Sequence, residues 1–150
     1  MKHRLAIALF LLATSLGCQS DVANATTVDE FTSMFRTAYD SGDKEAIDKM
    51  CDWTDVDGEL RDIQLGLLTM FLGDNRITNI STTPFDPNTP GNPINGREIK
   101  LNISPTHMFS IEHEGNGGFE GGPSSGTAAM PIGKKGGRYY FCGWTYTESQ

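Results

Sequence analysis

The sequence predicts an α+β domain in which two to three N-terminal helices pack on one face of a curled antiparallel sheet of four to five strands. Apolar residues recur at helical spacing from about residue 27 to residue 72. After residue 76 the apolar spacing becomes two, which is typical of strands. Helices that precede a run of strands are typical of the α+β class. The span 27–150 is short enough to form a single domain.

The first helix is predicted from an apolar stripe made of Phe31, Met34, Phe35, Ala38 and Tyr39. Thr27 and Glu30 form a capping box at its start, and Gly42 is placed to end it. Asp43 is placed to cap a second, shorter helix. The apolar face of this second helix contains Ala46, Ile47, Met50 and Cys51.

A third amphipathic segment runs from about Asp55 to Leu72. Its apolar positions at helical spacing are Leu60, Ile63, Leu67, Leu68 and Phe71. Gly66 lowers the helix propensity of this segment by about 1 kcal/mol. Gly73 is placed to end the helix.

The second half of the chain predicts strands. Residues 77–82 are rich in β-branched side chains, and a surface loop with four prolines follows them. From Arg97 onward, Ile99, Leu101 and Ile103 share one face, and Phe109 and Ile111 continue in strand spacing.

Residues 114–126 form a glycine-rich connection to the last two strands. These two strands, 127–132 and 138–146, are joined by a glycine-rich turn over residues 133–137. The last strand is apolar on both faces, so we expect it to be central in its sheet.

Two short segments resemble the NTF2-like, or SnoaL-like, superfamily. The run from Phe31 to Ile47 contains the pattern Ala38-x3-Gly42-Asp43-x2-Ala46 of the first two helices, and residues 137–141 resemble the final strand. The resemblance covers about a fifth of the mature chain and implies a cone-like fold. It also implies a pocket between the helices and the concave face of the sheet.

The N-terminus has the three-part layout of a secretory signal. Met1 to Arg4 is basic, Leu5 to Leu12 is an unbroken apolar run, and small residues lead to Cys18. The apolar run is too short to cross a bilayer as a helix, which takes about 20 residues. We therefore expect residues 1–17 to be a signal peptide.

The residues before Cys18 resemble the bacterial lipobox, in which a small residue precedes a cysteine that becomes lipidated. Gly17 and Cys18 match this pattern, whereas Ser15 departs from it. We expect lipidation at Cys18, a flexible tether over residues 18–26, and a location at the cell membrane or the outer membrane, facing the periplasm. The alternative is a soluble secreted protein that is cut after Ala25.

The net charge restricts the classes of partner. The formal charge of the chain is −7, and removal of Lys2 and Arg4 with the signal leaves −9. This sign argues against nucleic acid and anionic lipid, which are bound by clustered lysine and arginine. Only Lys134, Lys135 and Arg138 lie close together in the sequence, as is typical of a solvated hairpin tip.

Cys51 and Cys142 remain as an even pair of thiols. An exported protein permits a disulfide between them, which would close a loop worth about 4 to 5 kcal/mol. The alternative is two separate buried thiols. The sequence leaves both possibilities open.

An acidic cluster contains Asp52, Asp55, Asp57 and Glu59 and partly resembles a calcium-binding loop. The first ligand and the bidentate carboxylate of such a loop are missing, so we interpret these residues as acids at a helix start. We expect no metal site and no cofactor.

His107 and His113 lie on one face of an expected strand, about 20 Å apart, which is too far to share a metal ion. His113, between two glutamates, is expected to be solvated, and His107 is a candidate general base.

These residues lead to three hypotheses. The first is a non-catalytic, lipid-anchored envelope domain that binds a small ligand or a protein partner. The second is an NTF2-like isomerase or hydrolase in which His107 and a carboxylate form an acid–base pair. The third is a purely structural envelope component.

Overall fold

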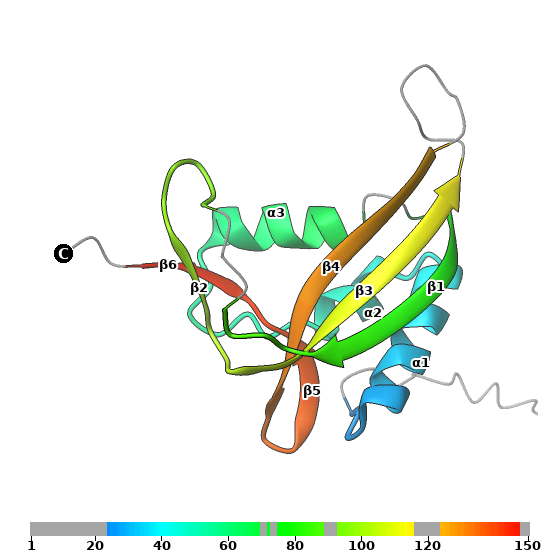
Figure 1. Cartoon of the computed structure of the whole chain (residues 1–150), viewed down its shortest axis with the longest axis horizontal. Coiled ribbons are helices and arrows are strands. Elements are labelled where there is room, and N and C mark those ends of the chain that lie inside the picture. Colours follow the sequence, from blue (N-terminus) through cyan, green and yellow to red (C-terminus); the bar gives the residue numbers. More distant parts are fainter. Residues whose placement is uncertain (1–23, 70–71, 73–74, 89–92, 116–123, 148–150) are drawn as a thin grey trace, which may run out of the picture.

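The computed structural model describes residues 24–69, 72, 75–88, 93–115 and 124–147 (Figure 1). The helices in this part of the chain are α1 (Val28–Asp40), α2 (Lys44–Lys49) and α3 (Gly58–Thr69). The strands are β1 (Asn75–Pro84), β2 (Ile99–Leu101), β3 (Pro105–Gly115), β4 (Ser124–Lys135), β5 (Arg138–Phe141) and β6 (Trp144–Tyr146). The expected signal segment and Cys18 lie outside the described residues.

The strands form two antiparallel sheets. One has the order β1-β3-β4-β5, and the other pairs β2 with β6. Figure 1 shows the helices on one side of the long, twisted strands β1, β3 and β4. The predicted α+β class is confirmed, with three helices packed against a curled antiparallel sheet. Within the described residues, no helix combines the length and the apolar character needed to span a membrane.

The starts of α1 and α2 are the ones that the sequence predicts. The Thr27 hydroxyl accepts a hydrogen bond from the backbone N–H of Glu30 at 3.2 Å, and the Glu30 carboxylate accepts one from the N–H of Thr27 at 3.2 Å. Asp43 accepts from the N–H of Ala46 at 2.9 Å and caps α2. Each cap satisfies N–H groups that have no partner inside the helix.

Four phenylalanines fill the space between α1 and the sheet. Phe31 and Phe35 point from α1 toward Phe109 of β3 and Phe141 of β5, and all four are buried. Five edge-to-face ring pairs join them, with centroids 5.0 to 5.6 Å apart. Such pairs contribute about 0.5 to 1.5 kcal/mol each beyond the area that they bury. The pocket that the superfamily resemblance implies at this place is therefore occupied by the protein's own core.

The sequence predicts one continuous final strand, but in the structure this strand is divided at Cys142 and Gly143. β5 belongs to the four-stranded sheet, whereas β6 pairs with β2. A side chain at Gly143 would lie 2.4 Å from the backbone oxygen of Asp52. The buried side-chain amide of Gln64 donates to the Cys142 carbonyl at 2.7 Å and accepts from the N–H of Trp144 at 3.1 Å. Close packing and an amide from α3 thus hold the chain where it leaves one sheet for the other.

The prediction that the last strand is central is also wrong, because β5 is at the end of the sheet order. Its outer edge is nevertheless covered by other parts of the chain. The N–H of Tyr139 donates to the carbonyl of Ala25 at 2.8 Å, and the N–H of Phe141 donates to that of Met50 at 2.9 Å. This cover explains why a strand at the end of the sheet is apolar on both faces.

The third helix differs from its predicted form in two ways. It begins at Gly58 rather than near Asp55, whose φ of +59° lies outside the helical region. Its buried stripe contains Leu60, Gln64 and Leu68, whereas Leu67 is 40% exposed. The polar Gln64 occupies a core position because it hydrogen-bonds to the break between β5 and β6.

The hairpin between β4 and β5 is tighter than predicted. Lys135 pairs with Arg138, so the loop contains only Gly136 and Gly137. Both glycines have positive φ, +58° and +83°, as a two-residue type I′ turn requires. Gly133 lies inside β4, where a side chain would lie 2.4 Å from the backbone oxygen of Ser104.

Candidate functional site

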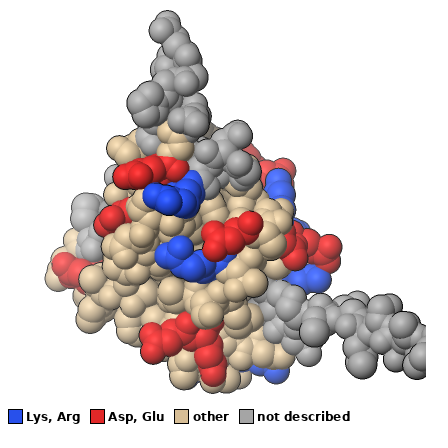
Figure 2. Space-filling view, turned by 90° about the vertical axis from the view of Figure 1, so that its right-hand side faces the viewer, with Lys and Arg blue, Asp and Glu red and all other residues tan. Residues whose placement is uncertain are grey.

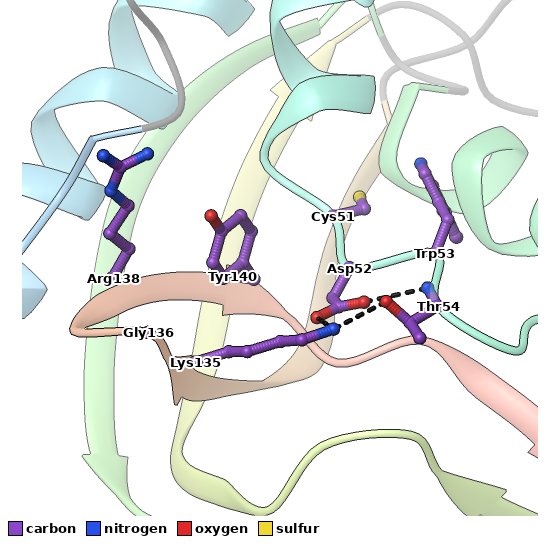
Figure 3. Close-up of a pocket in the computed structure, with 8 residues that line it drawn as sticks. All are labelled: Cys51, Asp52, Trp53, Thr54, Lys135, Gly136, Arg138 and Tyr140. Carbon is purple, nitrogen blue, oxygen red and sulfur yellow. Dashed lines mark hydrogen bonds and ion pairs between the residues drawn. The ribbon is translucent and has the colours of Figure 1, made fainter.

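A surface cleft lies between the segment that joins α2 to α3 and the β4–β5 hairpin. Its volume is about 430 Å³. The lining comes from one stretch of four residues and from the hairpin (Figure 3): Cys51, Asp52, Trp53, Thr54, Lys135, Gly136, Arg138 and Tyr140.

An ion pair joins the two walls of the cleft. The ammonium of Lys135 lies 2.7 Å from Asp52 Oδ2 and donates to the Thr54 hydroxyl at 2.6 Å. The backbone N–H of Thr54 donates to Asp52 Oδ1 at 2.8 Å. Asp52 is 6% exposed, whereas the Lys135 side chain is 46% exposed. The carboxylate therefore belongs to the protein interior, and the ammonium lies where a solute can reach it.

Asn102 fixes the position of the Asp52 wall of the cleft through hydrogen bonds. Its side-chain amide donates to the backbone oxygens of Asp52 and Thr54 at 2.8 and 3.0 Å and approaches Asp52 Oδ1 at 3.3 Å. Its carbonyl accepts from the N–H of Gly143 at 2.7 Å. One side chain thus connects the α2–α3 segment to the chain between β5 and β6, and this fixes the Asp52 wall.

Two opposing effects act on the pKa of Asp52. Burial raises it, but the hydrogen bonds from Lys135 and Thr54 and the positive charge of Lys135 outweigh burial, so the pKa is lowered from its usual value. Asp52 is therefore charged at neutral pH and remains paired with Lys135.

Arg138 and Tyr140 form the hairpin wall. They are two residues apart in β5 and so lie on one face of the strand. On the opposite side, the Trp53 indole N–H donates to the backbone and side-chain oxygens of Asp48 at 3.1 and 3.0 Å. The Arg61 guanidinium lies over the Trp53 ring, 5.3 Å from its centroid. The indole is thus held in place by its neighbours.

The two thiols that the sequence singles out are both buried and free in the structure. The backbone of Cys51 forms an isolated parallel β-bridge with that of Phe141, and both residues belong to the same core cluster. Cys142 follows Phe141 directly, so its side chain points to the opposite side of the chain, toward Gly133. Burial raises the pKa of Cys142 to about 12 and raises that of Cys51 well above its usual value.

His107 does not form the acid–base pair of the enzyme hypothesis within the described residues. It is half-buried, its Nδ1 lies 3.0 Å from the Thr106 hydroxyl, and its ring meets that of Tyr139 at a centroid distance of 6.2 Å. The ion pairs formed by the described acids involve lysine and arginine instead.

The expectation that His113 is solvated is wrong. Its side chain is 6% exposed, and on β3 it lies between Ile77 of β1 and Gly126 of β4. A side chain at position 126 would lie 3.0 Å from His113 Nε2. Because Gly126 has no side chain, the imidazole of His113 has room to lie over β4.

The acidic cluster is divided by the fold. Asp57 accepts from the N–H of Glu59 at 2.9 Å at the start of α3, as the helix-start interpretation predicts. Glu59 also accepts from the side chain of Asn95 at 2.9 Å. Asp52, by contrast, lies in the cleft. No group of three or more histidine, cysteine, aspartate or glutamate side chains in the described ranges is arranged to hold a metal ion.

Sequence reasoning missed the pairing of Asp52 with Lys135. It placed Asp52 among helix-start acids and Lys135 at a solvated hairpin tip. The two residues are 83 positions apart, and no local pattern connects them. Gln64 did carry a signal, because a polar residue midway between Leu60 and Leu68 lies on their face of the helix.

Comparison of the chain with protein-family models, with curated proteins and with solved structures finds no match. The resemblance to the NTF2-like superfamily therefore stays a prediction.

Proposed function

We propose that this chain is an exported domain, held at the cell envelope by a lipid on Cys18, which binds a small ligand or a protein partner at its surface and performs no catalysis. The observation that carries the surface role is the filled core. Phe31, Phe35, Phe109 and Phe141 occupy the space between α1 and the sheet, so a ligand must bind outside it.

The position of Ala25 supports lipidation over ordinary secretion. Ala25 is 2% exposed, and its carbonyl accepts the hydrogen bond from Tyr139 at the edge of β5. A cut after Ala25 would remove this residue and expose the edge of β5. A mature chain that begins at Cys18 keeps it.

The surface charge is mixed rather than basic. Figure 2 shows the face that lies to the right in Figure 1, where the described lysine and arginine side chains lie beside acidic ones. Nucleic acids are bound by clusters of lysine and arginine, which neutralise the phosphates. This face therefore gives no support to a nucleic-acid partner.

A purely structural role is the second candidate, because a filled core is also what such a component needs. The cleft at Asp52 and Lys135 supports the binding role over the structural one. A ligand-binding domain uses a hollow of this kind, whereas a purely structural component has no need of it.

Metabolic labelling with an alkyne fatty acid tests the anchor. Expression of the full chain in a bacterial host should give a labelled protein, and Cys18→Ser should abolish the label. Cys51→Ser is the matched control, because it also removes one thiol and should keep the label. Equal labelling of the wild type and Cys18→Ser would refute the anchor.

Thermal melting against a library of envelope metabolites tests the binding role. A specific ligand should raise the melting temperature in proportion to RT ln(1 + [L]/Kd). Melting curves that stay flat for every compound would argue against a small ligand and in favour of the structural role.

A further inference from the structure

The chain between the proposed anchor and the fold is short. Asn24 is the first described residue, and it follows Cys18 by six positions. A fully extended chain spans at most about 3.3 to 3.6 Å per residue, so this stretch reaches about 20 Å. A domain of about 125 residues has a radius of gyration of about 14 Å, and hence a diameter of about 35 Å. The side of the domain opposite Asn24 is therefore too far from the bilayer to touch it.

The first described residues are fixed to the fold and add no slack. Ala25 is 2% exposed, and its carbonyl accepts the hydrogen bond from Tyr139 at 2.8 Å. The N–H and the hydroxyl of Thr26 both donate to the carboxylate of Glu30, at 2.7 and 2.9 Å. The chain from the anchor is therefore attached at the outer edge of β5.

The tip of the β4–β5 hairpin lies beside this point of attachment. Tyr139 pairs with Lys134 in the sheet, and the turn at Gly136 and Gly137 is two positions from Tyr139. Adjacent strands are about 4.8 Å apart and residues within a strand about 3.3 Å, so the tip lies about 10 Å from Ala25. Figure 1 shows this hairpin at one end of the molecule and the paired opposite ends of β3 and β4 at the other.

The two ends of the sheet differ in charge. Residues 133–141 contain no acid, and the exposed Lys134 forms no ion pair among the described residues. Near the other end of the sheet, Glu112 and Glu114 of β3 are exposed. Anionic lipid headgroups attract lysine near the membrane surface and repel carboxylates. An anionic bilayer therefore favours the hairpin end over the far end.

Lys134 and Tyr139 form a surface that is separate from the cleft. Successive residues of a strand point to opposite faces, and Lys135 points into the cleft, where Asp52 compensates its charge. Lys134 is on the other face, with its ammonium 5.2 Å from the centroid of the Tyr139 ring. Long cationic side chains and tyrosine are both typical of membrane interfaces, because each has an apolar body and a polar end.

We propose that the β4–β5 hairpin lies against the anionic phospholipid headgroups of the bilayer that carries the anchor, with Lys134, the glycine turn and Tyr139 as the contact. The inference rests on the proposed lipid at Cys18. The mature chain is expected to carry −9, which keeps an unanchored domain away from such a surface. The short connection brings the domain to the bilayer, and the charge of the hairpin selects the side that faces it.

The start of α1 lies near the same point of attachment but carries the opposite charge. Asp29 and Glu30 are in its first turn, and both are exposed. Anionic headgroups repel these carboxylates, so the domain should tilt toward the hairpin and away from α1. The expected contact is therefore narrower than the whole side that the anchor can reach.

Paramagnetic relaxation enhancement tests this orientation. The full chain is expressed in a bacterial host, and the mature protein is isolated from membranes and placed in nanodiscs of phosphatidylglycerol and phosphatidylcholine with a nitroxide on the headgroup. The amide signals of residues 134–139 should be broadened most. Those of Glu112, Glu114 and Thr127 should be broadened least. Mass spectrometry of the N-terminal peptide from the same sample shows whether the lipid is present.

A charge variant tests the contact. Lys134→Glu should lower the ratio of hairpin broadening to far-end broadening by a factor of about 2 to 5, because one basic residue near an anionic surface has an effect of this size. Lys100→Glu is the matched control, because it makes the same change at an exposed lysine of β2 in the other sheet. It should leave the ratio unchanged.

A linker variant tests the role of the short connection. Twenty glycine and serine residues inserted after Ser20 should even out the broadening over the domain, because a flexible linker of this length lets the domain turn freely. The same linker added after Gln150 is the matched control and should keep the pattern of the wild type. A hairpin pattern that survived the insertion after Ser20 would refute the role of the short connection.

The orientation would be overturned by broadening that is uniform or greatest at the far end, or by a Lys134→Glu variant that behaves like the wild type. If the N-terminal peptide carried the lipid in such a sample, the anchor would stand without the orientation. A mature chain without a lipid on Cys18 would overturn both.

Discussion

Replacement of Gln64 by methionine should strongly destabilise the fold. The two side chains have similar length, so the change removes hydrogen bonds with little change in volume. In the structure Gln64 is 0% exposed and bonds to both the Cys142 carbonyl and the Trp144 N–H. A backbone group left buried without a partner costs about 1 to 3 kcal/mol. The added apolar burial recovers part of this loss, so we expect a net loss of about 2 to 4 kcal/mol.

Urea unfolding followed by circular dichroism measures this loss. Gln64→Met should lower the unfolding midpoint without a change in the slope, since the native fold is retained. Asp62→Met is the matched control, because Asp62 is exposed on the same helix and receives the same new side chain. If the two variants were equally stable, Gln64 would not hold the break between β5 and β6.

Three further predictions follow from the cleft, the glycines and the thiols. Because the pKa of Asp52 is lowered in the folded state, its contribution to stability is present above the unfolded pKa of about 4 and is lost as the pH falls through the folded pKa; urea melts between neutral and acidic pH should show a smaller acid loss for Asp52→Asn. Gly143→Ala should destabilise by about 1 to 3 kcal/mol or more, because its Cβ meets the Asp52 backbone, whereas Gly66→Ala, on an open helix face, should stabilise by about 0.5 to 1 kcal/mol in thermal melts. Cys51 and Cys142 should be alkylated only after unfolding, since both are buried with raised pKa values; peptide mapping that found rapid alkylation of the native protein, or a disulfide between them, would contradict this.

Local signals in the sequence were sufficient for the starts of α1 and α2. The capping box of Thr27 and Glu30 and the Asp43 cap are made by residues three positions apart. Their chemistry is complete within one helical turn, so it can be recognised without tertiary structure. The apolar stripe of α1 is equally local, and four of its five predicted residues are buried.

The division of the final strand could not be predicted, because its causes are remote in the sequence. Gln64 and Asn102 bond to Cys142 and Gly143 from 78 and 41 positions away. The alternating pattern of the strand continues through the break, and a single glycine is common in ordinary strands. The position of His113 was missed for the same reason, since it depends on the glycine opposite it in β4.

The ion pair at the centre of the cleft joins Asp52 and Lys135. Both residues were singled out in the sequence, but each was assigned a solvated role. An acid in a cluster at a helix start and a lysine at a hairpin tip both resemble solvated charges. Their ion pair forms because the chain between β5 and β6 and Asn102 bring the α2–α3 segment against the hairpin. Cys18 lies outside the described residues, so its expected lipidation remains a prediction from the sequence pattern.

The N-terminal peptide of the mature protein, isolated from bacterial membranes and identified by mass spectrometry, tests the proposed anchor most directly. We expect a peptide that begins at Cys18 and carries a diacylglyceryl thioether. A chain that kept Met1, or one that began at Thr26 after loss of Ala25, would contradict it.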